Sequence, residues 1–170
     1  MIDKSSTGKN EDPSSPQADV KKKRRHINPK ARSIGFTGYC GLSYAEFGDD
    51  SCTIGCELQP HHLNPSGAVH GGLIATMTDV AAGTMALEAD NCEHNIVTQN
   101  CNLHFIRPAQ GKTLRAVAKI IRKGRRVCVI NVDCFDDDGK LCTRAIYEVA
   151  YLDIPVPDFL ILPDSDNTEE

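Results

Sequence analysis

The sequence predicts an α+β domain in which one long apolar helix packs against an antiparallel sheet of five or six strands. The chain has 170 residues, which is enough for one ordinary domain and too few for two well-packed ones. Its longest apolar segment, residues 70–87, has the residue spacing of a helix. Two β-rich segments precede this helix and four follow it, so the expected order is β-β-α-β-β-β-β.

The distribution of charge divides the chain into three parts. Residues 1–33 carry nine Lys/Arg against four Asp/Glu, and we expect a disordered basic tail there because the segment has little apolar surface to bury. Residues 153–170 carry six Asp/Glu and no Lys/Arg, which predicts an acidic tail. Residues 34–152 form the predicted domain. The run Lys21–Arg25 resembles a nuclear or nucleic-acid-binding patch, but a solvated tail is the commoner explanation of such a run.

The two segments before the helix have the pattern of strands. Cys40–Phe47 reads as the first strand, and the turn at residues 48–50 follows it. Ser51–Leu58 alternates in hydrophobicity, so its apolar residues share one face. These residues are Cys52, Ile54, Cys56 and Leu58. The segment Gln59–Val69 reads as a loop.

The helical segment, His70–Leu87, is apolar on both of its sides, so we expect a helix that is buried all around. A membrane span is the competing interpretation. The segment is short for a span, carries Asp79 at its centre and lacks flanking Lys/Arg anchors, all of which disfavour that interpretation.

Four further strands are expected after the helix. Their predicted ranges are Asn95–Ile106, Thr113–Lys123, Arg125–Phe135 and Lys140–Leu152. The turn Asp136–Gly139 joins the last two as a hairpin.

The eight cysteines exclude two kinds of cysteine site. No C-x-x-C pair is present, so a zinc ribbon or a thioredoxin-type motif is excluded. Most of the cysteines lie in apolar runs, where a free thiol packs as a small hydrophobic group. The first 33 residues contain no apolar stretch that would form a signal peptide, and a reducing, cytoplasmic location is therefore expected.

The chemistry is concentrated between Asn64 and Gly83. Gly71 and Gly72 open the helix, where free backbone N–H groups and the positive end of the helix dipole can hold an oxyanion. Asp79 is the only formal charge in the helix, and a lone buried carboxylate is costly unless it is paired, hydrated or used in chemistry. Asn64 offers an amide that can orient a water or a carbonyl.

Structural explanations of the same residues remain open. Asp79 can be a structural acid satisfied by neighbouring N–H groups, and the glycines can serve the packing of the helix start. His61, His62 and His70 suggest a metal site, but no fourth ligand converges on them. We therefore expect exposed loop histidines and no metal.

The spacing of these residues resembles a known family. The pattern N-x-x-G-x-x-H-G-G-x₆-D-x-x-x-G is similar to the signature of the PaaI-like hotdog-fold acyl-CoA thioesterases. It is matched by Asn64, Gly67, His70, Gly71, Gly72, Asp79 and Gly83. The segment Val97–Pro108 resembles the strand that follows the helix in that family. The resemblance covers residues 38–152 and implies the hotdog fold, a sheet wrapped around one helix.

The resemblance also implies a role for each matched residue. Asp79 is expected to be the nucleophile or the general base that activates water, and the Gly71 N–H to polarise the thioester carbonyl. Asn64 is expected to hold the carbonyl or the lytic water, and His70 to support the loop and the thioester end. Thr98 matches a Ser/Thr that assists on the next strand. No cofactor is implied beyond the CoA of the substrate.

Geometry adds an argument for a homodimer. Gly71 and Asp79 are eight residues apart, which is about 12 Å along one helix. An oxyanion donor and an attacking carboxylate must both lie within about 3 Å of one carbonyl group. Two antiparallel copies of the helix satisfy this requirement, whereas one helix does not. The resemblance extends the expectation to a homotetramer.

Basic residues are concentrated after the helix. Eight of the ten Lys/Arg in residues 34–152 lie between Arg107 and Arg126, in a stretch without acids. Because coenzyme A carries phosphates, we expect Arg107, Lys123, Arg125 and Arg126 to contribute to its binding. The alternative is a solvated strand face.

The predicted function is an acyl-CoA thioesterase that releases a carboxylic acid and CoA. The alternative is a non-catalytic acyl-CoA-binding hotdog protein, which is disfavoured because a binder needs no carboxylate beside the carbonyl. Nucleic-acid binding ranks last, since no aromatic stacking platform accompanies the basic residues. The nature of the acyl group stays open among aryl, phenylacetyl, short-chain and long-chain thioesters.

Overall fold

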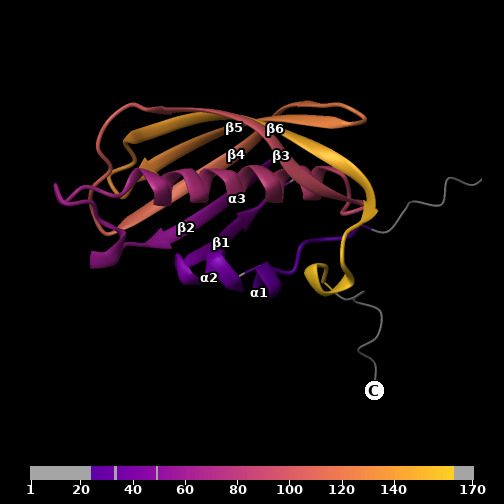
Figure 1. The fold of residues 1–170 in the computed structure, drawn as a ribbon, viewed down its shortest axis with the longest axis horizontal. Helices are drawn as coiled ribbons and strands as arrows, with labels where there is room; N and C mark the ends of the chain where they lie inside the picture. Colours follow the sequence, from indigo (N-terminus) through magenta and orange to yellow (C-terminus); the bar gives the residue numbers. More distant parts are fainter. Residues whose placement is uncertain (1–23, 33, 49, 163–170) are drawn as a thin grey trace, which may run out of the picture.

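The computed structural model describes residues 24–32, 34–48 and 50–162, and it has the predicted order of elements. Two strands precede the long helix and four follow it (Figure 1). The elements are α1 (Pro29–Arg32), α2 (Gly35–Tyr39), β1 (Leu42–Phe47), β2 (Ser51–Glu57), η1 (Pro60–His62), α3 (Gly71–Ala89), β3 (His94–Phe105), β4 (Thr113–Lys123), β5 (Val127–Asp136), β6 (Leu141–Pro155) and η2 (Asp158–Leu160), where η marks a 3₁₀ turn.

The six strands form one antiparallel sheet in the order β1-β2-β4-β5-β6-β3. The helix α3 lies across one face of this sheet and packs mainly against β2, β3, β4, β5 and β6 (Figure 1). The connection through α3 carries the chain from β2 to β3, which forms the far edge. The hairpin predicted at Asp136–Gly139 is confirmed, since the Gly139 N–H donates to the Asp136 carbonyl and Gly139 has a φ of +74°.

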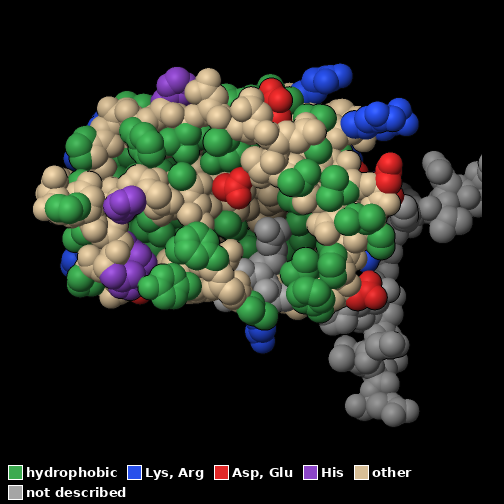
Figure 2. Space-filling view, in the orientation of Figure 1, with side chains coloured by type: hydrophobic (Ala, Val, Ile, Leu, Met, Phe, Trp, Pro, Cys, Tyr) green, Lys and Arg blue, Asp and Glu red, His purple; other side chains and the backbone are tan. Residues whose placement is uncertain are grey.

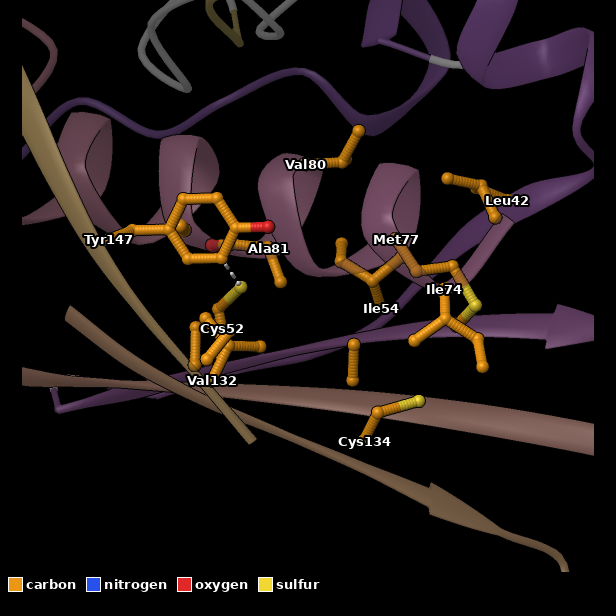
Figure 3. Packing of buried hydrophobic residues seen from close by; sticks show 14 of the residues in the cluster. Leu42, Cys52, Ile54, Ile74, Met77, Val80, Ala81, Val132, Cys134 and Tyr147 are labelled. Atoms are coloured by element: carbon orange, nitrogen blue, oxygen red, sulfur yellow. Dashed lines mark hydrogen bonds between the residues drawn. The ribbon is translucent and has the colours of Figure 1, made fainter. Parts of the chain in front are cut away.

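The core lies between α3 and the sheet. Figure 3 shows Ile74, Met77 and Ala81 of the helix directed toward the strands, whereas Val80 points to the opposite side. Alternate residues of the central strands face the helix and are buried, as period-two strands require. These strand residues include Cys52, Ile54, Cys56, Ala116, Ala118, Cys128, Ile130, Val132, Cys134, Ala145, Tyr147 and Val149. The shared face predicted for β2 is therefore confirmed.

The helix is buried all around only in its second half, which corrects the sequence-based expectation. Every residue from Val80 to Glu88 is buried. In the first half, Gly72 and Asp79 are exposed, and Ala75 and Thr76 are half-buried. These four positions follow the spacing i, i+3, i+4, i+7 and so form one uncovered face. No helix in the described part of the chain is long and apolar enough to cross a membrane.

The second half of α3 is covered by the two ends of the described chain, which meet there. Ile27 forms an isolated antiparallel bridge with Ile161. A second apolar cluster joins the two ends to the helix, and it consists of Ile27, Leu87, Cys92, Val156 and Ile161. We call the contact between residues 24–28 and 156–162 the terminal clasp. Folded structure thus extends beyond residues 34–152, because apolar residues in both expected tails cover the helix.

A buried carboxylate anchors the terminal clasp. The Glu88 side chain is 4% exposed, and its Oε1 accepts the Ile27 N–H at 2.7 Å. Its Oε2 lies 2.9 Å from His26 Nδ1. From the basic run 21–25, Arg25 donates its N–H to Asn91 Oδ1 and its guanidinium to the Cys92 carbonyl. Lys21–Lys23, and with them most of the expected basic tail, lie outside the described residues.

All eight cysteines are free thiols, and seven of them are buried. The exception is Cys101, which is exposed on β3. Burial raises the pKa of the Cys134 thiol to about 12, so this thiol stays protonated and packs as an apolar group.

We predict that Glu88→Ala destabilises the fold by about 1–3 kcal/mol, because the buried N–H of Ile27 loses its acceptor. The measurement is the free energy of unfolding from denaturant titration. Glu46→Ala on the exposed side of β1 is the matched control and should change it by less than about 0.5 kcal/mol. Equal effects of the two variants would contradict an anchoring role for Glu88.

Candidate active site

The loop before α3 is held by the side chain of Asn64. Its Oδ1 accepts the N–H groups of Ser66 and Ala68 at 2.9 and 3.2 Å. Gly67 completes the turn with a φ of +79°, a conformation that favours glycine. Both bonds of the Asn64 side chain use its oxygen, so its NH₂ is the part that has donors for a ligand.

His70 caps the N-terminus of α3. Its Nδ1 accepts the Gly72 N–H at 2.9 Å, which places the proton of a neutral ring on Nε2. The backbone N–H of His70 donates to the His62 carbonyl at 2.8 Å. A Cβ at Gly72 would lie 3.0 Å from Nδ1, so glycine lets the imidazole approach the helix end. The imidazole therefore caps the helix, and the support of the loop and the thioester end that the resemblance implied for His70 stays a prediction.

Gly71 is the first residue of α3, at the positive end of the helix dipole. The ring of Phe105 packs over it, and a Cβ at Gly71 would lie 3.1 Å from that ring. Asn64, Gly71 and Arg107 line one groove together with Ile74 and Phe105. We call it the Gly71 groove.

Asp79 lies in a different groove, which we call the Asp79 groove. Thr98 on β3 donates its hydroxyl to Asp79 Oδ1 at 2.8 Å, and both residues line this groove with Gly83 and Ile96. Asp79 is exposed within the single chain, so the expectation of a buried carboxylate is wrong for one chain alone. Its partner is a hydroxyl rather than the backbone N–H groups of the structural alternative.

Sequence reasoning missed a buried pair of hydroxyls next to Asp79. The hydroxyls of Thr78 and Tyr147 lie 2.8 Å apart. Burial, with a smaller contribution from the Asp79 charge, raises the pKa of Tyr147 to about 12, so the phenol stays protonated. Thr78 follows the apolar spacing of the helix and gave no separate signal.

One chain does not bring all the predicted residues together. Asn64 and Gly71 line one groove, whereas Asp79 and Thr98 line the other. Gly71 at the start of the helix and the Asp79 carboxylate are about 12 Å apart along α3. Figure 2 shows the face that carries α3 and β3, on which hydrophobic side chains are widespread and Lys/Arg lie near the rim.

The predicted CoA-binding cations are also divided. The Lys123 ammonium binds the Ala89 carbonyl at the C-terminus of α3 and lies 3.4 Å from Asp90 Oδ1, so it neutralises the negative end of the helix. Arg125 and Arg126 are exposed in the neighbouring turn between β4 and β5. Arg107 lies at the Gly71 end, about 27 Å away along the helix axis.

His62 is buried, which corrects the expectation of an exposed loop histidine. Its Nδ1 accepts the Gln59 N–H at 3.1 Å and lies 3.9 Å from the Cys56 sulfur. Burial lowers its pKa, and the neighbouring His61 lowers it further. Within the described ranges, no three His, Cys, Asp or Glu side chains are grouped to hold a metal ion.

One helix wrapped by an antiparallel sheet defines the hotdog class, and solved structures of that class superpose on this chain. A thioesterase from Haemophilus influenzae has a TM-score of 0.70 at 19% identity, covering 73% of this chain and 87% of its own. The PaaI protein from the phenylacetic acid degradation operon of Escherichia coli has a TM-score of 0.66 at 16% identity, covering 71% and 86%. At these identities the likeness shows the fold.

Sequence comparison adds the family. Residues 66–143 match the model of the thioesterase superfamily. A protein of Saccharolobus solfataricus, named as a candidate esterase, is 34% identical over 80 residues, which span 47% of this chain and 56% of that protein. The 1,4-dihydroxy-2-naphthoyl-CoA hydrolase of Escherichia coli is 24% identical over 115 residues, spanning 68% and 85%. The chain therefore has the hotdog fold, its residues 66–143 match the thioesterase superfamily, and the relatives it resembles include a thioester hydrolase.

Proposed function

We propose that the protein hydrolyses acyl-CoA thioesters to a carboxylic acid and CoA, at two equivalent sites of a homodimer. The observation that carries the proposal is the division of the oxyanion donor and the carboxylate between two grooves of one chain. The name of the Escherichia coli relative, a CoA thioester hydrolase, supports CoA as the thiol. The reaction needs water and no cofactor beyond the CoA of the substrate.

Strand β3 offers the surface for the second copy. It is a twelve-residue edge strand that pairs with β6 alone among the described strands. Its side chains include Val97, 45% exposed, and Phe105, 58% exposed. A long apolar edge of this kind favours pairing with another strand. The uncovered face of α3 lies beside it, so one contact would cover both.

The contacts of β3 fix the register of the proposed dimer. Thr98 binds Asp79, and seven residues later Phe105 packs over Gly71. An antiparallel pair of β3 strands centred between Cys101 and Asn102 sets Thr98 of one copy opposite Phe105 of the other. The same two-fold axis sets Asp79 of one copy beside Gly71 of the other. A site with a carboxylate and an oxyanion donor then forms twice.

In this site, the Gly71 N–H and the helix dipole polarise the thioester carbonyl and hold the developing oxyanion. The Asn64 NH₂ donates to the same carbonyl or to the water. As a general base, Asp79 takes a proton from water while the oxygen attacks the carbonyl carbon; the C–S bond then breaks and the thiolate of CoA takes up the proton. As a nucleophile, the Asp79 carboxylate attacks the carbonyl carbon and the C–S bond breaks, which gives an anhydride and the thiolate of CoA. Water then hydrolyses the anhydride to the carboxylic acid and the free Asp79 carboxylate, and the released proton goes to the thiolate. The Thr98 hydroxyl orients the carboxylate in either route.

In this register the Lys123, Arg125 and Arg126 end of one copy lies beyond the Gly71 end of the other, about 15 Å farther along the helix axis. Arg107 already lies in the Gly71 groove. We therefore keep Arg107, Arg125 and Arg126 as candidates for the phosphates of CoA, and assign Lys123 mainly to the helix terminus. The eight free thiols support our proposal of a cytoplasmic location.

Asp79→Asn should lower kcat/KM for acyl-CoA hydrolysis at least about 100-fold, because the variant has no carboxylate to activate water or attack. The free energy of unfolding should change by less than about 0.5 kcal/mol, since Asp79 is exposed in the chain. Asp153→Asn, at an exposed position of β6, is the control for charge removal. Full activity of Asp79→Asn would show that this carboxylate is not part of the reaction.

Mixed dimers test the shared site. Gly71 is the first residue of α3 and His70 before it has a ψ of 129°, so the backbone accepts proline, which removes the N–H and adds a Cβ next to Phe105. We expect Gly71→Pro to lose about 100-fold or more in kcat. Gly71→Ala keeps the N–H while making the same contact with Phe105, and it should retain most activity.

Co-refolding inactive Gly71→Pro with inactive Asp79→Asn should restore activity. Each mixed dimer has one site with both defects and one intact site, so its activity should reach about half that of the wild-type dimer. Native mass spectrometry counts the mixed dimers. Mixed dimers without recovered activity would place both groups in the site of one chain and overturn the proposal.

We predict that the double variant Arg125→Gln/Arg126→Gln raises KM for acyl-CoA about tenfold with little change in kcat, since phosphate contacts bind ground and transition states equally. Thioesters of truncated pantetheine should be unaffected. Lys119→Gln, on the exposed side of β4, is the control. Equal effects on both substrates would exclude a role in binding the nucleotide.

A further inference from the structure

The Asp79 groove extends well beyond Asp79. It follows one side of α3, where Asp79, Gly83 and Leu87 succeed one another at four-residue spacing. Ile96 of β3 forms a wall, and Leu160 of η2 lines the end near Leu87. The volume of the groove is about 420 Å³. It is thus an open groove that begins at the proposed reacting carboxylate and reaches Leu160.

The two grooves differ in charge, which distinguishes the two halves of a thioester. The Gly71 groove contains the Arg107 guanidinium, whereas among the described residues Asp79 is the only charged side chain that lines the Asp79 groove. Phosphates are attracted by the first and repelled by the second. Beyond Asp79 the lining combines the aliphatic side chains of Val80, Leu87 and Ile96 with polar ones of Thr37 and Asn95. The charge difference therefore favours an uncharged group in the Asp79 groove and CoA in the other.

The length of the groove selects the size of that group. Asp79 and Leu87 are about 12 Å apart along the helix. With carbon–carbon bonds of about 1.5 Å, an extended alkyl chain advances about 1.3 Å per carbon, so about nine carbons span this distance. Among the described residues, no aromatic side chain lines the groove. The side-chain amide in the wall of the groove belongs to Asn95, and its Oδ1 already accepts the Ile96 N–H.

Gly83 lies in the floor of the groove one turn beyond Asp79, and Ile96 packs against it. A Cβ at this position would lie 3.1 Å from Ile96 Cδ1, so a larger side chain would push Ile96 into the groove. At the end of the groove, Leu160 is fixed by the terminal clasp. Its carbonyl accepts the Asn28 N–H at 2.8 Å, and its side chain packs against the second apolar cluster.

We propose, on the basis of the proposed function, that the Asp79 groove holds the acyl chain of a straight aliphatic CoA thioester of about eight to ten carbons. Gly83 admits the chain past the reacting carbonyl, and Leu160 closes the end. Both residues determine specificity, and neither takes part in the chemistry.

The test measures kcat/KM for the wild-type protein with straight-chain acyl-CoAs from butyryl to hexadecanoyl and with benzoyl-CoA. Each buried methylene raises kcat/KM about fourfold, so the value should rise to a maximum at eight to ten carbons and then fall. Gly83→Leu should lower the decanoyl-to-butyryl ratio of kcat/KM at least about tenfold. Leu160→Ala should move the maximum to longer chains. Phe159 is the exposed neighbour of Leu160 and does not line the groove, so Phe159→Ala should leave the chain-length profile as in wild type.

The outcomes separate this inference from the proposed function. A protein that hydrolyses none of the thioesters overturns the proposed function and this inference with it. Hydrolysis with benzoyl-CoA preferred, or without dependence on chain length, overturns only the substrate class. If Gly83→Leu fails to fold, Leu160→Ala decides, because a profile identical to that of Phe159→Ala overturns the role of Leu160 and of the groove.

Discussion

The helix α3 carries apolar residues on every side, and the rest of the structure depends on how those sides are covered. A helix of this composition is stable in water only when other elements surround it. The sheet covers one side along the whole length, and the terminal clasp covers the opposite side of the second half. The first half keeps a face that its own chain leaves open, and Asp79 stands where the covered and uncovered halves meet. The need to bury this helix thus places both the proposed dimer contact and the proposed reaction at one point.

Local patterns predicted the secondary structure well, because each element has its own period and its own turn. Thr113–Lys123 is observed with the bounds predicted for it, and the alternation of Ser51–Leu58 identified the buried face of β2. The helix ends two residues later than expected, at Ala89, and the Lys123 ammonium stabilises its C-terminus by binding the Ala89 carbonyl. That contact joins residues 34 positions apart, so the local sequence pattern could not predict it.

The candidate site could be predicted only in part, and the missing part depends on contacts over long distances. Short-range spacing identified Gly71, Asp79 and Asn64 as unusual residues. It did not show that Asp79 is exposed within the chain, nor that His62 is buried against Cys56. The ends of the chain were expected to be tails because their average composition is polar. Single apolar residues such as Ile27 and Ile161 nevertheless cover the helix, and an average over a segment does not reveal them.

If the Asp79 groove holds the acyl chain as proposed, the terminal clasp links substrate choice to folding. Leu160 packs in the apolar cluster that covers the second half of α3, and it also lines the end of the Asp79 groove. A smaller residue there lengthens the groove and removes buried apolar contacts at the same time. Evolution toward longer substrates at this position therefore carries a cost in stability, and it requires a compensating change elsewhere in the clasp. The range of accessible substrates is bounded by how much stability the two chain ends contribute.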